Sequence, residues 1–214
     1  QKLAEFNMTL LGRLTLGPLW YFIALKKEFL KSFKKVSSVN HHLGRGKYII
    51  ADILIPDAII RKHLHTTADA LHEINLKKNL VGSNISGSLH SANAHFANML
   101  LACYLATGQD AANIIEGSQG VVYTAIKPEG LYFSVTLPNI IVGTVGNGKH
   151  HDFVKENLEL MGCSQPNSTQ ENSIHLASVI AATVLCGELS LLAALTNPGE
   201  LMRAHEAIER KKTN

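Results

Sequence analysis

Cysteine is scarce in this sequence, and its arrangement excludes two kinds of stabilising framework. The 214 residues include three cysteines, Cys103, Cys163 and Cys186, an odd number in apolar or scattered surroundings. Their spacing is that of neither a disulfide framework nor a metal site. We therefore expect no metal, and a reducing compartment, the cytoplasm, as the location.

A strong excess of one charge and long hydrophobic runs are also missing. Charged residues make up 17% of the chain and the formal net charge is +3, which is too small an excess to indicate nucleic-acid binding. The apolar stretch from Leu14 to Leu25 contains Pro18 and is much shorter than the roughly 20 residues of a membrane span. We interpret it as a core segment and expect no membrane contact by this chain.

The chain does contain enough apolar residues for a core, since 46% of its residues are hydrophobic. Alternating apolar residues predict a strand at 47–56, and Asp57 is expected to cap a helix that runs to about Ile74. Further elements are predicted as helices at 93–106, 153–160 and 171–195, strands at 121–126 and 131–142, and a last helix after a break at 197–199. This pattern is that of an α+β fold with a small antiparallel sheet. The helix at 93–106 is apolar nearly all round and is expected at the centre.

The most informative segment contains Asp110. It reads Gly108-Gln109-Asp110 and follows the apolar helix that opens near His95 and Asn98. A carboxylate at the end of a buried helix, with His95 and Asn98 one turn apart on that helix, suits a desolvated polar site. The structural alternative is that Gly108 ends one helix and Asp110 caps the next. This segment alone leaves both interpretations open.

Six segments follow one another in a specific order. They are Gly44-Arg45-Gly46-Lys47, Asn75 to Ser83, Asn93 to Asn98, Gly108-Gln109-Asp110, the glycine-rich turn Gly143 to Gly148, and Gly187 to Leu195 with His205. In this order they resemble the catalytic half of 3-hydroxy-3-methylglutaryl-coenzyme A (HMG-CoA) reductases. The resemblance implies the large substrate-binding domain of that family, with residues 34–214 as its C-terminal part and residues 1–33 as a segment that does not match.

The same resemblance implies a reaction and its catalytic residues. HMG-CoA would be reduced in two steps to mevalonate and coenzyme A, with NADPH, or NADH as the alternative, as cofactor. Lys34 would stabilise charge on the carbonyl oxygen, Asp110 would hold that lysine, and His205 would protonate the departing thiolate. Taken alone, Lys34 lies in a basic run typical of a solvated helix face, and His205 suits a surface position.

Further residues are implied to contact the ligands. Substrate contacts are expected from Lys35, Lys78, His95, Asn98, Leu191 and Leu195, and cofactor contacts from Val145, Gly146, Asn147 and Arg210. Lys78 would also reach Asp110. The structural alternatives are an exposed lysine, core leucines and polar groups that satisfy only the backbone. Asn147 replaces a glycine usual in the family, but asparagine tolerates positive backbone angles.

Two family segments are not found in this sequence: one of the Glu-Asn-Val-Ile-Gly type and one of the Asp-Ala-Met-Gly-Met-Asn type. Phe33 also stands where an aspartate usually precedes the catalytic lysine. We therefore expect a reductase part that is not active alone; the alternative is a non-catalytic relative that acts as a binding or assembly module. The apolar helices, and the family's sites at subunit interfaces, indicate a homo-oligomer.

Overall fold

A three-stranded antiparallel sheet and one long helix organise the described part of the chain. The computed structural model describes residues 45–88, 90–146, 148–166 and 168–208, which belong to one compact unit, residues 35–214. Strands β1 (Lys47–Pro56), β2 (Val121–Lys127) and β3 (Gly130–Ile140) pair in the order β1-β3-β2. The predicted strands and their antiparallel arrangement are therefore confirmed.

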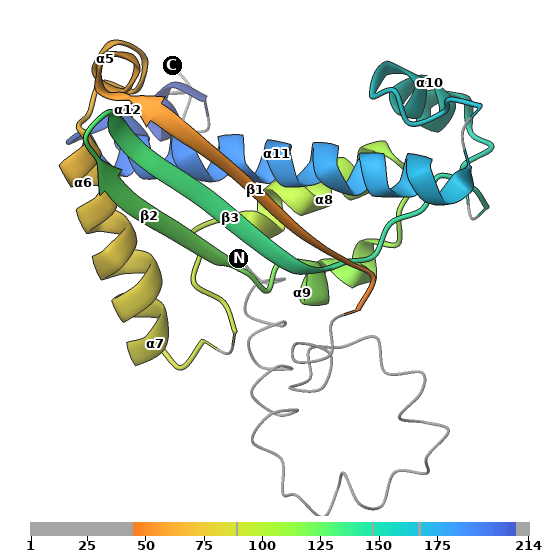
Figure 1. Cartoon of the computed structure of the whole chain (residues 1–214), viewed down its shortest axis with the longest axis horizontal. Coiled ribbons are helices and arrows are strands. Elements are labelled where there is room, and N and C mark those ends of the chain that lie inside the picture. Colours follow the sequence, from red (N-terminus) through yellow and green to blue (C-terminus); the bar gives the residue numbers. More distant parts are fainter. Residues whose placement is uncertain (1–44, 89, 147, 167, 209–214) are drawn as a thin grey trace, which may run out of the picture. The chain divides into compact units, whose positions relative to one another are not determined.

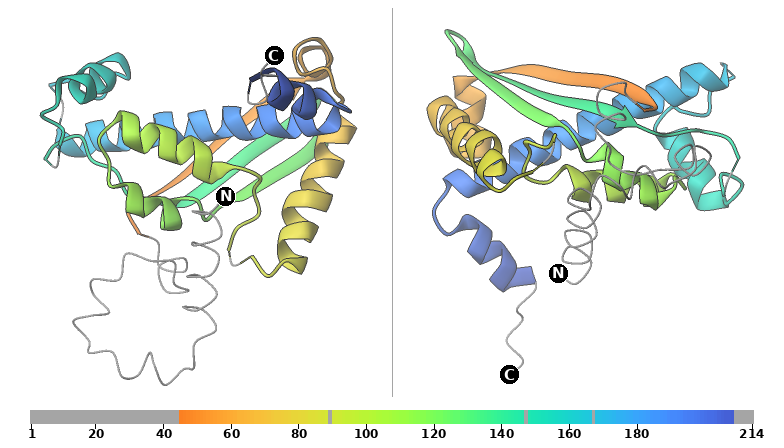
Figure 2. Two further views of the ribbon diagram at one scale, coloured as in Figure 1. Left: turned by 180° about the vertical axis from the view of Figure 1, so that it is seen from behind. Right: turned by 90° about the horizontal axis from the view of Figure 1, so that it is seen from below.

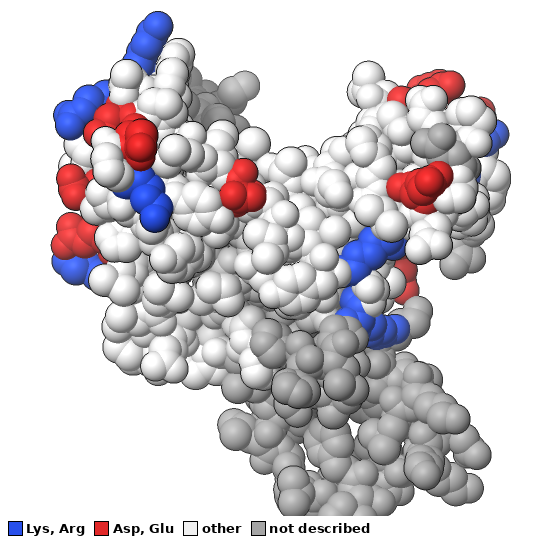
Figure 3. All heavy atoms as spheres, viewed as in Figure 1, with Lys and Arg blue, Asp and Glu red and all other residues white. Residues whose placement is uncertain are grey.

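The two faces of the sheet differ because side chains alternate along each strand. Leu131, Phe133 and Val135 of β3 are fully buried on the inner face. On the outer face, Tyr48 is 63% exposed and Tyr123 is 55% exposed. In the view of Figure 3, few charged side chains lie over the middle of the described part of the chain. The inner face thus forms the core, and the outer face is apolar but exposed.

Helix α11 (Thr169–Thr196) crosses the inner face of the sheet, and helix α8 (Phe96–Ala106) packs against α11 (Figures 1 and 2). The Ser168 side chain accepts from the Glu171 backbone and the Glu171 side chain accepts from the Ser168 backbone, so a capping box starts α11. The predicted helix at 171–195 is confirmed. By length and composition α11 could cross a membrane, but a core helix has the same composition, and α11 contacts β1, β3 and α8.

The single helix predicted from Asp57 to Ile74 is wrong. The structure has α5 (Asp57–Ile59), a π-helical turn η1 (Ile60–Leu64) and α6 (Ala68–Ile74), followed by a second π-helical segment, η2 (Asn75–Gly82), and α7 (Ser83–Ile85). The break comes at His65, whose φ is 53°. Thr67 then caps α6 by accepting from the Ala70 N–H at 3.2 Å. Asp57 is the first residue of α5 rather than its cap.

Helix α8 also differs from the prediction. It begins at Phe96 rather than Asn93, because the Ala94 and His95 N–H groups donate to a side chain of α11 instead of belonging to a helical turn. It is not buried all round: Phe96, Leu100 and Tyr104 form a buried stripe, whereas Leu105 on the opposite face is 58% exposed. The expected central helix is thus half exposed, and α11 carries buried residues along most of its length.

The remaining elements surround the ends of α8 and α11. After α8 come a 3-10 turn η3 (Ala111–Asn113) and α9 (Ile114–Gly117). The predicted helix at 153–160 is confirmed as α10 (Asp152–Leu160), and the predicted last helix is α12 (Glu200–Ile208), after the break at 197–199.

Candidate functional site

A buried carboxylate lies at the N-terminal end of α8. Glu188, in the middle of α11, is fully buried. Its Oε1 lies 2.5 Å from the Ala94 nitrogen and 3.2 Å from Asn79 Nδ2, and its Oε2 lies 2.9 Å from the His95 nitrogen. Burial raises the pKa of Glu188, and the hydrogen bonds from Ala94 and His95 oppose that shift.

Four of the predicted substrate residues lie around this carboxylate. Lys78 is exposed and directly precedes Asn79 in η2. His95 is the N-cap residue of α8, and its Nδ1 lies 3.2 Å from Asn98 Nδ2. Leu191 is half-buried and lies nearly one turn after Glu188 on α11, which puts both on one face of that helix. We call Lys78, Asn79, His95, Asn98 and Glu188 the Glu188 end. Leu195, one turn beyond Leu191, is partly buried against the core.

The C-terminal end of α8 brings two sequence motifs together. The Gln109 side chain donates from Nε2 to the Gly143 carbonyl at 2.9 Å and accepts from the Gly143 nitrogen at 3.0 Å. Lys149 Nζ donates to the Gly108 carbonyl. The Gly108-Gln109-Asp110 segment and the glycine-rich turn are thus held side by side by hydrogen bonds between Gln109 and Gly143, which are 34 positions apart in the chain.

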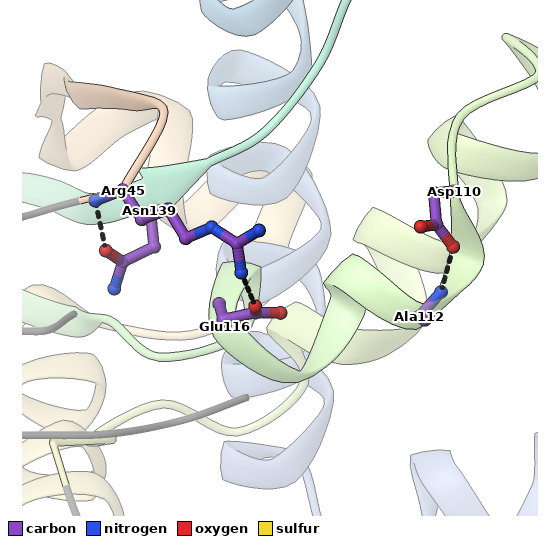
Figure 4. Close-up of polar contacts among 5 residues, drawn as sticks. All are labelled: Arg45, Asp110, Ala112, Glu116 and Asn139. Carbon is purple, nitrogen blue, oxygen red and sulfur yellow. Dashed lines mark hydrogen bonds and ion pairs between the residues drawn. The ribbon is translucent and has the colours of Figure 1, made fainter. Parts of the chain in front are cut away.

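Asp110 and a buried ion pair lie at the same end (Figure 4). Asp110 is exposed, and its Oδ1 accepts from the Ala112 N–H at 3.0 Å, so it caps η3. The capping interpretation is therefore observed, and it does not exclude a second role for the same carboxylate. Arg45 Nη1 lies 2.5 Å from Oε1 of the fully buried Glu116, and the Arg45 nitrogen donates to Asn139 Oδ1 at 2.9 Å. We call Arg45, Gln109, Asp110 and Glu116 the Asp110 end.

The pKa of Glu116 is raised, first by burial and to a smaller degree by the charge of Asp110, while Arg45 opposes the shift. Its second oxygen, Oε2, is buried and has no hydrogen-bond partner. Gly46, beside Arg45, has a φ of 82°, and a Cβ there would lie 2.4 Å from the Ile140 carbonyl oxygen. Glycine is therefore required at this position for the turn that presents Arg45.

The glycine-rich turn borders a cavity of about 420 Å³ that is lined by Val145, Lys149 and Lys155, among others. Gly146 has a φ of 74° and Gly148 a φ of 78°, conformations that glycine adopts without strain. A Cβ at Gly146 would meet no atom within 4 Å, so the backbone there is open to a ligand. Burial lowers the pKa of Lys149. Backbone and lysine groups in this arrangement suit an anionic ligand.

A second cavity, of about 580 Å³, lies between the end of η1, the last turns of α11 and the start of α12. His63, His65 and Arg203 line it, and Arg203 also donates to Glu200. The predicted catalytic residue His205 is half-buried in α12. Lys34, Lys35, Asn147 and Arg210 lie outside the described residues. Among the residues that the structure describes, no group of three or more His, Cys, Asp or Glu side chains is arranged to hold a metal.

The two ends are separated by the length of α8. The helix has 11 residues and is therefore about 16 Å long, at a rise of about 1.5 Å per residue. Lys78 belongs to the N-terminal end of this helix and Asp110 to its C-terminal end. Within one copy of the chain the structure therefore does not bring Lys78 to Asp110, the contact that the sequence predicts.

Sequence reasoning did not single out Glu116, Glu188 or Arg45 as separate residues, although the last two lie in quoted motifs. One signal was present for Glu188. A glutamate inside a long apolar helix is rarely left buried without partners, so its position in Gly187 to Leu195 indicates a buried polar contact. Glu116 carries no such signal, because it lies in a short segment of mixed composition.

The fold and these two clusters define an α+β domain with polar sites at both ends of a packed helix. The family described as Hydroxymethylglutaryl-coenzyme A reductase matches residues 23–210. The chain belongs to this family.

Individual relatives agree with this assignment. The chain is 46% identical over 178 residues to the 3-hydroxy-3-methylglutaryl-coenzyme A reductase of Aeropyrum pernix, and 45% identical over 177 residues to that of Methanocaldococcus jannaschii. Each comparison covers 83% of this chain and 42% of the relative. With the reductase of Phycomyces blakesleeanus the identity is 43% over 181 residues, which is 15% of that relative. The chain thus spans less than half the length of these relatives.

Proposed function

We propose that this chain supplies the C-terminal part of the catalytic domain of an HMG-CoA reductase of the mevalonate pathway. The complete enzyme reduces HMG-CoA in two steps to mevalonate and coenzyme A. The observation that carries the proposal is the family match across residues 23–210. The hydrogen bonds that join Gly108-Gln109-Asp110 to the glycine-rich turn support it, because they bring a carboxylate and a candidate cofactor turn to one place.

The chemistry assigned to the catalytic residues follows from charge. Negative charge collects on the carbonyl oxygen during reduction, and the Lys34 ammonium stabilises that charge more in the transition state than in the ground state. The Asp110 carboxylate holds this lysine in position and favours its charged form. His205 protonates the departing coenzyme A thiolate as a general acid, a common role of histidine.

The substrate residues are assigned to the Glu188 end and its neighbours. Lys78 binds the carboxylate or hydroxyl of the hydroxymethylglutaryl group, together with Lys35. His95 and Asn98, already joined to each other, offer polar contacts beside it. Leu191 and Leu195 form the apolar wall of the same pocket.

The described part of the glycine-rich turn fits a dinucleotide. Val145 lines a cavity that is also lined by Lys149 and Lys155, groups that match phosphate in charge, and the backbone at the next residue, Gly146, is open. We propose that Val145, Gly146, Asn147 and Arg210 bind NADPH, with NADH as the weaker alternative. Two molecules of the cofactor, bound one after the other, would supply the two hydrides of the reaction.

A second copy of the chain could bring Lys78 and Asp110 together in one site. Because Lys78 and Asp110 lie at opposite ends of a helix about 16 Å long, we propose that one site combines the Asp110 end of one copy with the Glu188 end of another, in a homodimer. Nucleic acid and membrane are not proposed as partners of this chain. The free thiols of Cys103, Cys163 and Cys186 support a reducing compartment, the cytoplasm.

The test is a chimera in which residues 34–214 replace the matching part of the Aeropyrum pernix relative. We expect the chimera to form mevalonate from HMG-CoA with NADPH, and more slowly with NADH. A chimera that folds and dimerises, binds HMG-CoA and yet forms no mevalonate would leave the second candidate, a non-catalytic binding module. The capping role of Asp110 is the observation that favours this second candidate.

A further inference from the structure

The Glu188 carboxylate is buried in the core and is surrounded by hydrogen-bond donors from other segments. It is fully buried in a helix whose neighbouring positions are mostly apolar. A buried carboxylate is costly unless hydrogen-bond donors surround it. Glu188 receives three donors, the Ala94 and His95 backbone N–H groups and Asn79 Nδ2.

These donors come from two separate segments of the chain. Asn79 belongs to η2, the segment that carries Lys78, whereas Ala94 and His95 precede α8. Asn79 Nδ2 also donates to Asn75 Oδ1 at 2.8 Å, and Asn75 Nδ2 donates to the Val122 carbonyl at 3.2 Å. A continuous set of hydrogen bonds therefore runs from α11 through η2 to strand β2, with Glu188 at its buried end.

The neighbouring glycine lets this contact form. A Cβ at Gly187 would lie 2.2 Å from Met99 Sδ, so a larger residue would require the Met99 side chain of α8 to move. The close approach of the two helices brings the Glu188 side chain within reach of the amides at the start of α8. Gly187 and Glu188 thus act together, one by its small size and the other by its charge.

Two other polar side chains, His95 and Asn98, lie at the start of α8 beside the amides that Glu188 binds. The first free N–H groups of a helix are usually satisfied by the N-cap side chain. In α8 the N-cap side chain, His95, makes no such bond, and the Asn93 side chain accepts only from Phe96. Glu188 accepts from the Ala94 and His95 amides just before the helix, and beside them the His95 and Asn98 side chains hydrogen-bond to each other.

We propose that Glu188 is a positioning residue whose carboxylate holds the Lys78 segment and the His95–Asn98 segment in one fixed arrangement. This inference rests on the proposed function, which assigns substrate contacts to Lys78, His95 and Asn98. The carboxylate itself is assigned no contact with substrate, since it is fully buried and accepts from three protein donors.

The first test measures amide hydrogen exchange in the 214-residue chain and needs no ligand. In Glu188→Gln, a donor amide replaces one acceptor oxygen, so protection at Ala94, His95 and the 75–82 segment should fall about tenfold or more. Amides of β3 such as Val135 should keep their protection. The matched control is Glu73→Gln, which removes an exposed carboxylate paired with Lys77 near the same segment. Unchanged exchange at both segments in Glu188→Gln would overturn the inference.

A second variant tests the inference if Glu188→Gln does not fold. Asn79→Ala removes only the link to η2, so protection should fall at 75–82 and persist at Ala94 and His95. Equal protection of 75–82 in Asn79→Ala and in the wild-type chain would overturn the inference as well.

The second measurement is the affinity for HMG-CoA by calorimetry. We expect Glu188→Gln to weaken binding about tenfold and Glu188→Asp, which keeps the charge, to restore part of the loss. Since Glu188 acts in part through Lys78, the combined effect of Glu188→Gln and Lys78→Ala in the double variant should be smaller than the sum of the two single effects. Additive effects would overturn the positioning role. A wild-type chain that does not bind HMG-CoA would count against the proposed function, and the exchange measurement would then decide the inference by itself.

Discussion

Arg45 and Glu116 form a partly buried ion pair in which Arg45 Nη1 lies 2.5 Å from Glu116 Oε1. The Arg45 side chain is 30% exposed, and the Glu116 side chain is 0% exposed. The pair joins the turn that precedes β1 to helix α9, 71 positions later in the chain. Removal of one member of such a pair leaves a buried charge without a partner.

Arg45→Met should therefore destabilise the chain more than Glu116→Gln does. We expect a loss of about 3 kcal/mol in the free energy of unfolding for Arg45→Met. The double variant should recover part of that loss, because it no longer buries an unpaired carboxylate. Urea unfolding measures all three. The control is Arg203→Met, which breaks an exposed pair with Glu200 and should cost about 1 kcal/mol or less. Equal losses at Arg45 and Arg203 would contradict the prediction.

Stability should decrease as the pH rises through the titration of Glu116. Burial raises the pKa of Glu116 above its ordinary value of 4.5, so between these two values the folded chain binds more protons than the unfolded chain. The free energy of unfolding then falls with rising pH over that window. Glu116→Gln should flatten this part of the profile in thermal melts taken from pH 4.5 upward.

Glu73 provides a control of opposite sign. Its hydrogen bond to Lys77 lowers its pKa, so its contribution is present above its ordinary pKa and is lost as the pH falls. The difference between the wild-type chain and Glu73→Gln should shrink in acid. A Glu116→Gln profile parallel to that of the wild-type chain would show that Glu116 does not titrate in this range.

Asp110→Asn separates the two interpretations of this carboxylate. Asparagine accepts the Ala112 N–H as well as aspartate does, so the melting temperature should hardly change, whereas Asp110→Ala should lose about 1 kcal/mol of stability with the cap. In the chimera, Asp110→Asn should abolish turnover, because the charge that holds Lys34 is gone. Steady-state kinetics and thermal melts of the same variants distinguish the two interpretations. Retained turnover in Asp110→Asn would show that Asp110 has only the structural, capping role.

The 214-residue chain alone should turn over HMG-CoA negligibly with NADPH or NADH. The reason is that the glutamate segment and one cofactor segment of the family are not found in the sequence. Mevalonate formation is measured with the purified chain, and the chimera serves as the positive control. Turnover by the chain at a rate near that of the chimera would refute this prediction.

The chain should self-associate. Exposed apolar side chains such as Tyr48 and Ile50 remain on the outer face of the sheet, and the proposed site needs two copies to bring its ends together. Light scattering at micromolar concentration should give the mass of a dimer or a larger species. A clean monomer would count against both the association and the two-copy site.

Local sequence was sufficient for the strands and for the long helix. The alternation at 47–56 and the turn residues at 127–130 act over a few positions, so the hairpin of β2 and β3 was predicted nearly to the residue. Local sequence also found the ordered motifs that imply the family, and the family match confirms that assignment. It failed at His65, where the left-handed backbone ends η1 without a glycine or proline to mark the break.

Contacts between distant residues account for the rest. Helix α8 begins at Phe96 because a carboxylate 94 positions away accepts the amide of Ala94, and Gln109 holds the glycine-rich turn across 34 positions. The sequence places Lys78 and Asp110 in separate motifs, but only the structure shows that these motifs lie at opposite ends of helix α8. Periodicity and turn chemistry are local properties of the chain, whereas the burial of Glu116 and Glu188 depends on which segments pack together, and no single segment contains that information.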